Sequence, residues 1–176
     1  MPTRLIRPAT AADAPACAGI YAPYVRGTAV SFETEPPDER EVAARIEAAS
    51  ARHAWLVLEE DGEVRGYACG GPFAARAAYA WSCETSVYLA PGLRRTGAGR
   101  ALCEALFERL AERGYRTLVA GITLPNEASV GLHRALGFEV VGTFSRIGFK
   151  HGRWHDVLRL QRPLGPADGS APAPLR

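Results

Sequence analysis

The sequence has few of the features that would assign it at once to a class of protein. Its four cysteines include no C-x-x-C pair and do not have the spacing of zinc ligands. The formal net charge of +2 is too small to indicate a surface that binds nucleic acid. No apolar run is long enough to cross a membrane, and the N-terminal residues form no apolar signal segment. We therefore expect reduced thiols and a cytoplasmic protein with no nucleic-acid or membrane partner.

Length and composition instead fit one globular domain. Of the 176 residues, 47% are hydrophobic and 23% are charged, which allows a full core. Residues 165–176 are rich in Pro, Gly, Ala and Ser. We expect a single folded domain over residues 1–164, followed by a disordered tail over residues 165–176.

Hydrophobic periodicity and turn residues predict alternating strands and helices. Strands are expected at residues 3–7, 55–59, 64–69, 80–89, 117–122, 138–144 and 155–160. Helices are expected at residues 10–21, 38–52, 98–113 and 126–137. The sequence Gly70-Gly71-Pro72 is expected to break or bulge the third strand. This layout predicts an α/β fold with a mixed sheet of about seven strands and helices on both faces.

Residues 84–102, E-T-S-V-Y-L-A-P-G-L-R-R-T-G-A-G-R-A-L, read as a strand, a turn and a loop that opens a helix. Such a helix start attracts anions, because its first N–H groups have no intrahelical acceptor and the helix dipole is positive there. Gly97 and Gly99 let the backbone approach a phosphate closely. The charged residues of the loop are Arg94, Arg95 and Arg100. No Gly-Lys-Ser/Thr follows, and the third glycine of a dinucleotide fingerprint is missing, so neither of those nucleotide sites is indicated.

The pattern V-Y-L-A-P-x-L-R-R-T-G-A-G-R-A-L resembles the acetyl-CoA-binding motif of the GNAT superfamily of N-acetyltransferases. The resemblance implies loop amides that hold a pyrophosphate and a preceding strand that hydrogen-bonds the pantetheine arm. It also implies a mostly antiparallel sheet with an acetyl-CoA cleft between two splayed strands, one ending at Leu89 and one at residues 117–122. The implied cofactor-binding residues are Val87, Tyr88, Leu89, Arg94, Arg95, Thr96, Gly97, Ala98, Gly99, Arg100, Asn126 and Ser129. The alternative is a helix start that is flexible because of its glycines and that binds an anion only adventitiously.

A second stretch, N-x-x-S followed by L-H and G-F between Asn126 and Phe138, resembles the other half of the GNAT signature. In that family the asparagine contacts the cofactor, and a tyrosine protonates the departing thiolate. This sequence has His133 where the superfamily usually has tyrosine. Because an imidazole titrates near pH 6.5, His133 could act as the acid, or it could be a structural histidine.

Glu84 is the candidate general base. A primary amine reaches the thioester mostly protonated, so a nearby carboxylate can remove its proton. Glu84 lies just before the part of the strand implied to bind the cofactor. The alternative is an acidic residue at a strand end with no chemical role.

Five shorter motifs resemble one branch of GNAT, the phosphinothricin and methionine sulfone or sulfoximine acetyltransferases. They are S-F-E-T-E-P, A-R-x-A-Y, E-T-S-V-Y, L-H-x-A-L-G-F and G-F-K-H-G-R-W-H-D, and the likeness covers about residues 4–164. The implied substrates are L-phosphinothricin, methionine sulfoximine and methionine sulfone, and a homodimer with the substrate site near its interface is also implied. The candidate substrate-binding residues are Phe32, Arg76, Tyr79 and Thr85. His151 and His155 are four residues apart, but they lie in a glycine-containing hairpin without acidic partners, so no metal is expected.

These patterns favour an acetyl-CoA-dependent N-acetyltransferase in which the amine attacks the thioester directly. Glu84 is the expected base, and His133 is the expected acid. Two alternatives remain. One is an N-acetyltransferase that acts on the terminus of a peptide or protein, and the other is a catalytically silent acyl-CoA-binding module.

Overall fold

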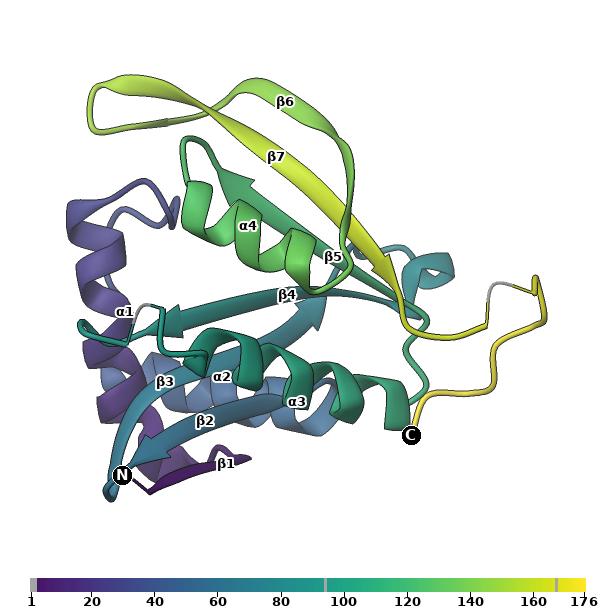
Figure 1. Cartoon of the computed structure of the whole chain (residues 1–176), viewed down its shortest axis with the longest axis horizontal. Helices are drawn as coiled ribbons and strands as arrows, with labels where there is room; N and C mark the ends of the chain where they lie inside the picture. The colour runs from purple at the N-terminus through teal and green to yellow at the C-terminus, as the bar shows by residue number, and fades with distance from the viewer. Residues whose placement is uncertain (1–2, 94, 167) are drawn as a thin grey trace.

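The computed structural model describes residues 3–93, 95–166 and 168–176, which fold around one seven-stranded sheet (Figure 1). Its strands are β1 (Arg4–Pro8), β2 (Trp55–Glu60), β3 (Glu63–Pro72), β4 (Ser82–Leu89), β5 (Thr117–Thr123), β6 (Glu139–Lys150) and β7 (Arg153–Pro163). They lie in the order β1-β2-β3-β4-β5-β7-β6. Only β4 and β5 are parallel, and all other neighbours are antiparallel. The predicted mixed, mostly antiparallel sheet is confirmed.

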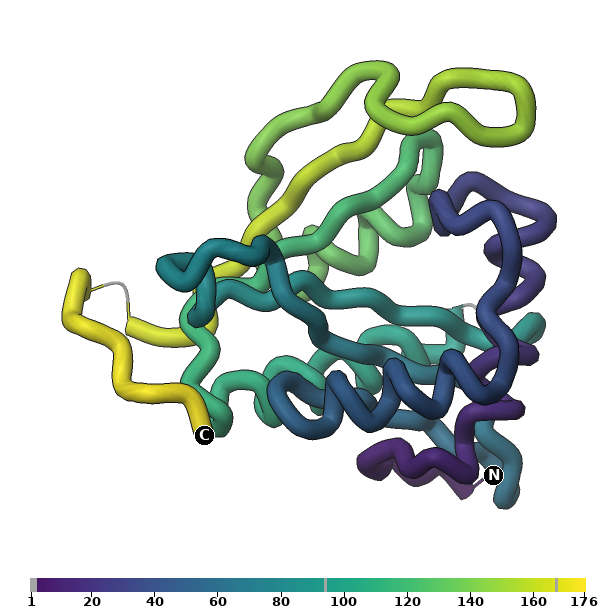
Figure 2. The backbone as a smooth tube through the Cα atoms, turned by 180° about the vertical axis from the view of Figure 1, so that it is seen from behind, coloured from purple at the N-terminus to yellow at the C-terminus, as the bar shows by residue number. Residues whose placement is uncertain are grey.

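Helices cover both faces of the sheet, as predicted. Helices α3 (Ala98–Glu112) and α4 (Glu127–Ala135) lie on the face toward the viewer in Figure 1, and α1 (Ala14–Gly27) and α2 (Glu39–Arg52) lie on the other, seen in Figure 2. Each face has its own apolar core. Leu102, Leu106 and Leu110 of α3 are fully buried in one, and Val25, Ile46 and Val57 are buried in the other.

The two central strands separate part of the way along the sheet. β4 pairs with β5 only over Ser82–Glu84 against Thr117–Val119. From Thr85 onward, β4 is paired with β3 alone. One edge of β4 is therefore left facing the gap between the strands, at the place where the resemblance implies the acetyl-CoA cleft.

The first helix is longer than its sequence pattern predicts. It continues to Gly27 rather than ending near Tyr21, although Pro23 lies inside it. A proline in a helix removes one backbone hydrogen bond. Ile20 and Val25 of this helix are buried against the sheet, and this packing favours the helical form of its last turns.

The prediction that Gly70-Gly71-Pro72 breaks or bulges the third strand is wrong. β3 runs through to Pro72, and Gly71 pairs with Glu84. A Cβ at Gly70 would lie 2.7 Å from Cys83 Sγ, so this glycine permits a close approach of β3 and β4. The irregularity in the pairing of β2 with β3 lies near the start of β3, where Leu58 and Glu59 oppose Gly66 and Val64, so that Arg65 is the extra residue.

The last residues lie along the body of the protein, next to the end of α3 (Figure 1). Trp81 Nε1 donates to the carbonyl of Ala173 at 2.9 Å, and Leu175 packs against the larger core. The leucine and the indole donor of these contacts lie far apart in the sequence, so composition does not indicate them. The division into a folded domain and a disordered tail over residues 165–176 stays a prediction.

The β6–β7 hairpin extends beyond the sheet and contacts the loop that follows α1. Lys150 is buried, and its Nζ donates to the carbonyls of Val25 at 2.6 Å and Ser31 at 2.7 Å. In the same loop, the ring of Phe32 lies directly against Gly148, where a Cβ would overlap it. The hairpin therefore fixes the loop over the open part of the sheet.

Candidate active site

A narrow pocket lies where β4 and β5 part. It is lined by Thr85, Val87 and Tyr88 of β4, by Gly121 and Ile122 of β5, and by Asn126, Ser129 and His133 at and in α4. The hydroxyl of Thr85 is buried in this pocket and has no hydrogen-bond partner among the described residues. An unsatisfied buried hydroxyl is costly, so Thr85 marks a polar position in the wall of the pocket whose partner the described residues do not supply.

The N-terminus of α3 has the geometry of an anion site. Gly97 caps the helix with φ +81°, a conformation that strongly favours glycine, and Arg95 has φ +63°. No acidic residue lies in the first turn, so the positive end of the helix dipole is not neutralised. Gly99 is buried, and a Cβ there would lie 3.4 Å from Leu89 Cδ1, so the helix start packs closely on β4.

The other residues predicted to surround the phosphates differ in their contacts and in their exposure. Thr96 Oγ1 donates to the carbonyl of Leu93 at 2.9 Å, which closes the loop on itself. Arg100 forms an ion pair of 2.8 Å with Glu104 on the surface of α3. Ala98 is buried at the first position of the helix. Arg94 lies outside the described residues.

Successive residues of β4 face opposite sides of the sheet. Tyr88 points toward α1, where its ring centroid lies 4.8 Å from that of Tyr21. Val87 and Leu89 point the other way and pack on the core beneath α3. The backbone of Tyr88, rather than its side chain, is therefore what could face a cofactor between the strands.

Asn126 and Ser129 form the start of α4. Asn126 Oδ1 accepts from the backbone N–H of Ser129 at 3.2 Å and caps the helix. Because the cap uses the side-chain oxygen, the amide nitrogen of Asn126 stays available to a ligand in the pocket.

His133 is buried in the wall of the same pocket. Its Nδ1 lies 2.8 Å from the carbonyl oxygen of Ser129, and because a carbonyl can only accept, Nδ1 carries the hydrogen. In the neutral ring, Nε2 is then the bare nitrogen. The ring also packs edge-on against Phe138, with a centroid distance of 5.1 Å. Burial lowers the pKa of His133 below its usual 6.5, which favours the neutral ring.

Glu84 forms an ion pair with Arg159, a residue that the sequence patterns did not indicate. Arg159 Nη1 donates to Glu84 Oε1 at 2.7 Å. The two strands that carry them, β4 and β7, are separated in the sheet by β5. The side chain of Arg159 crosses β5 at Gly121, where a Cβ would lie 2.5 Å from Nη1. The only sequence signal that could have indicated Arg159 is its charge, which is unusual between the two apolar residues Leu158 and Leu160.

Three of the predicted substrate-binding residues lie on different segments of the chain and have different neighbours. Phe32 contacts the β6–β7 hairpin at Gly148. Tyr79 packs edge-on against Phe73, with ring centroids 5.3 Å apart. Arg76 is exposed at the start of a short 3-10 helix, Ala77–Tyr79. Contacts through Phe73 and Arg159 connect Tyr79 to Glu84. Within the described ranges, no contact brings Arg76 to the same place.

The cysteines are poor nucleophiles. Burial raises the pKa of Cys69, Cys83 and Cys103 to about 12, and that of Cys17 to about 11. A thiol reacts through its thiolate, which such pKa values disfavour. This property fits direct attack on a thioester rather than transfer through a cysteine.

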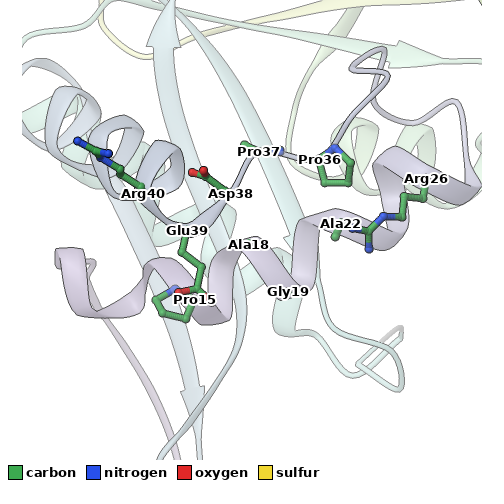
Figure 3. A pocket seen from close by; sticks show the side chains of 10 residues that line it. All are labelled: Pro15, Ala18, Gly19, Ala22, Arg26, Pro36, Pro37, Asp38, Glu39 and Arg40. Atoms are coloured by element: carbon green, nitrogen blue, oxygen red, sulfur yellow. The ribbon is translucent and has the colours of Figure 1, made fainter.

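A wider hollow lies away from the sheet opening, between α1 and residues 36–40 (Figure 3). Small residues of α1, such as Ala18 and Gly19, line one side, and Asp38 and Arg40 bring charges of both signs to the other. The hollow contains none of the residues predicted for the site.

Over residues 3–93, 95–166 and 168–176, no helix has the length and apolar character needed to cross a bilayer. Within the same ranges, no three His, Cys, Asp or Glu side chains gather as a metal site.

Comparison with known proteins identifies the fold and the family. Residues 6–158 match the family model described as an acetyltransferase (GNAT) domain. The chain is 43% identical to phosphinothricin N-acetyltransferase of Streptomyces viridochromogenes over 97% of its own length and 91% of the relative's. It is 37% identical to the L-methionine sulfoximine/L-methionine sulfone acetyltransferase of Pseudomonas paraeruginosa, over 92% of this chain and 95% of that one.

A solved structure gives the same result. The phosphinothricin acetyltransferase of Sinorhizobium meliloti, crystallised in complex with acetyl-CoA, superposes with a TM-score of 0.92 at 39% identity, over 97% of this chain and 94% of that one. The chain therefore belongs to the GNAT N-acetyltransferases, in the branch that contains the phosphinothricin and methionine sulfoximine acetyltransferases.

Proposed function

We propose that this protein transfers the acetyl group of acetyl-CoA to the α-amine of a small amino-acid analogue such as L-phosphinothricin, methionine sulfoximine or methionine sulfone. The observation that carries the proposal is the opening between β4 and β5. It has an anion-binding helix start and the unsatisfied hydroxyl of Thr85 on one face, and the carboxylate of Glu84 on the other. The names of the relatives support the substrate class.

Acetyl-CoA fits the residues of the α3–α4 face. The free N–H groups at residues 97–99 would hold its pyrophosphate, with Arg95 and Arg100 nearby. The edge of β4 at residues 85–88, which has no neighbouring strand among the described residues, would hydrogen-bond the pantetheine arm. The carbonyl of Leu89 already accepts from the Tyr24 hydroxyl at 2.8 Å. The Thr85 hydroxyl and the Asn126 amide would meet polar groups near the thioester.

Proton transfers in this reaction would be divided between the two faces of the sheet. Glu84 takes the proton from the α-ammonium, and the freed amine nitrogen bonds to the thioester carbonyl carbon. Attack leaves a second proton on the nitrogen. The bare Nε2 of His133 would take this proton and pass it to the thiolate as the carbon–sulfur bond breaks. Because His133 Nδ1 is held by Ser129, Nε2 is the nitrogen left to do this.

A substrate panel tests the proposal. Thiol release from acetyl-CoA should be fast with L-phosphinothricin, methionine sulfoximine or methionine sulfone, and slow with short peptides. Release with peptides alone would favour an acetyltransferase that acts on termini. Tight binding of acetyl-CoA without thiol release from any amine would favour a catalytically silent binding module.

Replacing Glu84 by Gln should lower kcat by about 10²-fold or more, because the amide cannot accept the amine proton. The loss should be largest at low pH, where more of the amine is protonated. Steady-state kinetics across pH would measure it, with Glu63→Gln, exposed at the start of β3, as the matched control. If acetyl-CoA affinity is lost instead, Glu84 is a structural residue.

Replacing Gly97 by Val should weaken acetyl-CoA binding by at least about tenfold. Valine is strained at φ +81°, and its side chain would occupy the space above the first helical N–H groups. Calorimetric titration with acetyl-CoA would measure the change. Gly131→Ala, in the interior of α4 with no atom near its added Cβ, is the control. Unchanged affinity in Gly97→Val would refute the phosphate-loop assignment.

Replacing His133 by Phe keeps the aromatic contact with Phe138 and should lower kcat on the order of 10²-fold. The change should also reduce the loss of stability at acid pH. Burial lowers the folded-state pKa of His133, so the unfolded chain binds more protons, and stability is lost as pH falls below about 6.5. Melting temperatures at several pH values would test this, with His151→Gln as control. Full activity in His133→Phe would leave the residue a structural role only.

We also propose that the protein is a homodimer and that the outer side of the β6–β7 hairpin is its interface. β6 is an edge strand, and its exposed apolar side chains are Val140, Val141, Phe144, Ile147 and Phe149, with Trp154 on β7. An exposed apolar strip on an edge strand is a liability in a monomer and typical of an interface. A second copy there would lie next to the loop that carries Phe32.

Sedimentation equilibrium would test the dimer. The protein should sediment as twice its 18.9 kDa chain, and Phe149→Glu combined with Val141→Glu should sediment as a monomer. Lys150, which holds the hairpin to the body, is left intact in that variant. A wild-type monomer at micromolar concentration would contradict this assignment.

A further inference from the structure

Arg159 is the charged residue of the site for which the proposed chemistry has no role. It lies on β7 between two core leucines, and its neighbours Leu158 and Leu160 are buried beneath α3 and α4. Because side chains alternate along a strand, Arg159 points to the opposite face, the same face as Glu84. The side chain of Arg159 is 21% exposed and that of Glu84 is 37% exposed, so a solute can reach both.

The guanidinium is held in a fixed place with donors to spare. Nη1 donates to Glu84 at 2.7 Å, and the group lies 5.9 Å above the ring of Phe73. A guanidinium has five N–H donors. In the described part of the chain, neither Nε nor Nη2 of Arg159 makes a hydrogen bond, so these donors remain free.

The backbone of β5 is shaped to let this side chain through. Gly121 pairs with Arg159 in the sheet, and a Cβ at Gly121 would lie 2.5 Å from Nη1 and 3.5 Å from Glu84 Oε1. The arginine therefore crosses the strand only because residue 121 has no side chain. A surface arginine would need no such clearance.

A carboxylate beside a guanidinium is complementary to an α-amino acid. The substrate carries an ammonium and a carboxylate on one carbon, with the charges as close together as those of the pair. An arginine fork also binds a carboxylate through two parallel hydrogen bonds. We propose that Glu84 and Arg159 together recognise the α-amino-acid group, with Arg159 binding the α-carboxylate while Glu84 receives the α-ammonium.

The inference rests on the proposed function and adds a selection rule to it. An α-amino acid would satisfy both charges of the pair. An amine without the carboxylate would leave the spare donors of Arg159 unsatisfied. The site should thus select free amino acids over amides, simple amines and residues inside a peptide, independently of the side chain at the far end of the substrate.

The test compares L-methionine sulfone with its α-carboxamide and with the decarboxylated amine. Arg159→Met should lower kcat/KM for the amino acid by about 10- to 100-fold, the value of a charged hydrogen-bond pair. It should lower kcat/KM for the two analogues by less than about threefold. Taking the ratio of variant to wild type for each substrate cancels the different basicities of the amines. Arg153→Gln, an exposed arginine on the same strand, is the matched control.

A second variant displaces the guanidinium without removing its charge. Gly121→Ala should push Nη1 out of place and reduce the preference for the amino acid in the same direction, by a smaller factor. Equal losses for all three substrates in Arg159→Met would overturn the inference, because Arg159 would then act only by positioning Glu84. Wild-type protein that turns over the amino acid and the carboxamide equally well would overturn it too.

Binding separates this inference from the proposed function. Titration calorimetry with L-methionine sulfone on the protein saturated with coenzyme A should show binding that Arg159→Met weakens by about 10- to 100-fold. No thiol release from any of the three amines in the wild type would refute the proposed acetyl transfer, while carboxylate-dependent binding would still support Arg159. No binding in the wild type would refute the inference alone, because acetyl transfer is judged by thiol release across the substrate panel.

Discussion

The separation of β4 from β5 is the constraint on which the site depends. If the two parallel strands stayed paired along their whole length, their backbone N–H and C=O groups would hydrogen-bond to one another. The sheet would then have no opening. Here the pairing ends at Glu84 and Val119. The backbone beyond that point has groups to satisfy, and burying them unpaired would be costly. A ligand bound along β4 would supply partners for these backbone groups. The buried hydroxyl of Thr85 is a further polar group without a partner among the described residues.

The same opening assigns different chemistry to the two faces of the sheet. The α3–α4 face has the positive helix start at Gly97 and the buried, neutral His133. The α1–α2 face has the ion pair of Glu84 and Arg159. A thioester lying in the gap would be reached from one face by its cofactor contacts and from the other by the amine. Alternation of side chains along β4 is what separates these roles by a single residue.

Much of this was predictable from local patterns. The helix start at Gly97, the cap at Asn126 and the strand that carries Glu84 each have a signature within a few residues, and each lies where it was expected. The predictions that failed or differed concern cases in which distant packing outweighs local preference. Burial of Val25 keeps α1 helical past Pro23, and the approach of Cys83 explains why Gly70 continues a strand rather than ending it.

The sequence by itself determined the family, the order of elements, the anion-binding loop and the candidate acid and base, because these depend on residues close together in the chain. Only the tertiary structure decided the partners of those residues. The meeting of Glu84 with Arg159, 75 residues away, depends on the sheet order and on the missing side chain at Gly121. The anchoring of Phe32 by the β6–β7 hairpin and the tautomer of His133 depend likewise on contacts that exist only once the chain has folded.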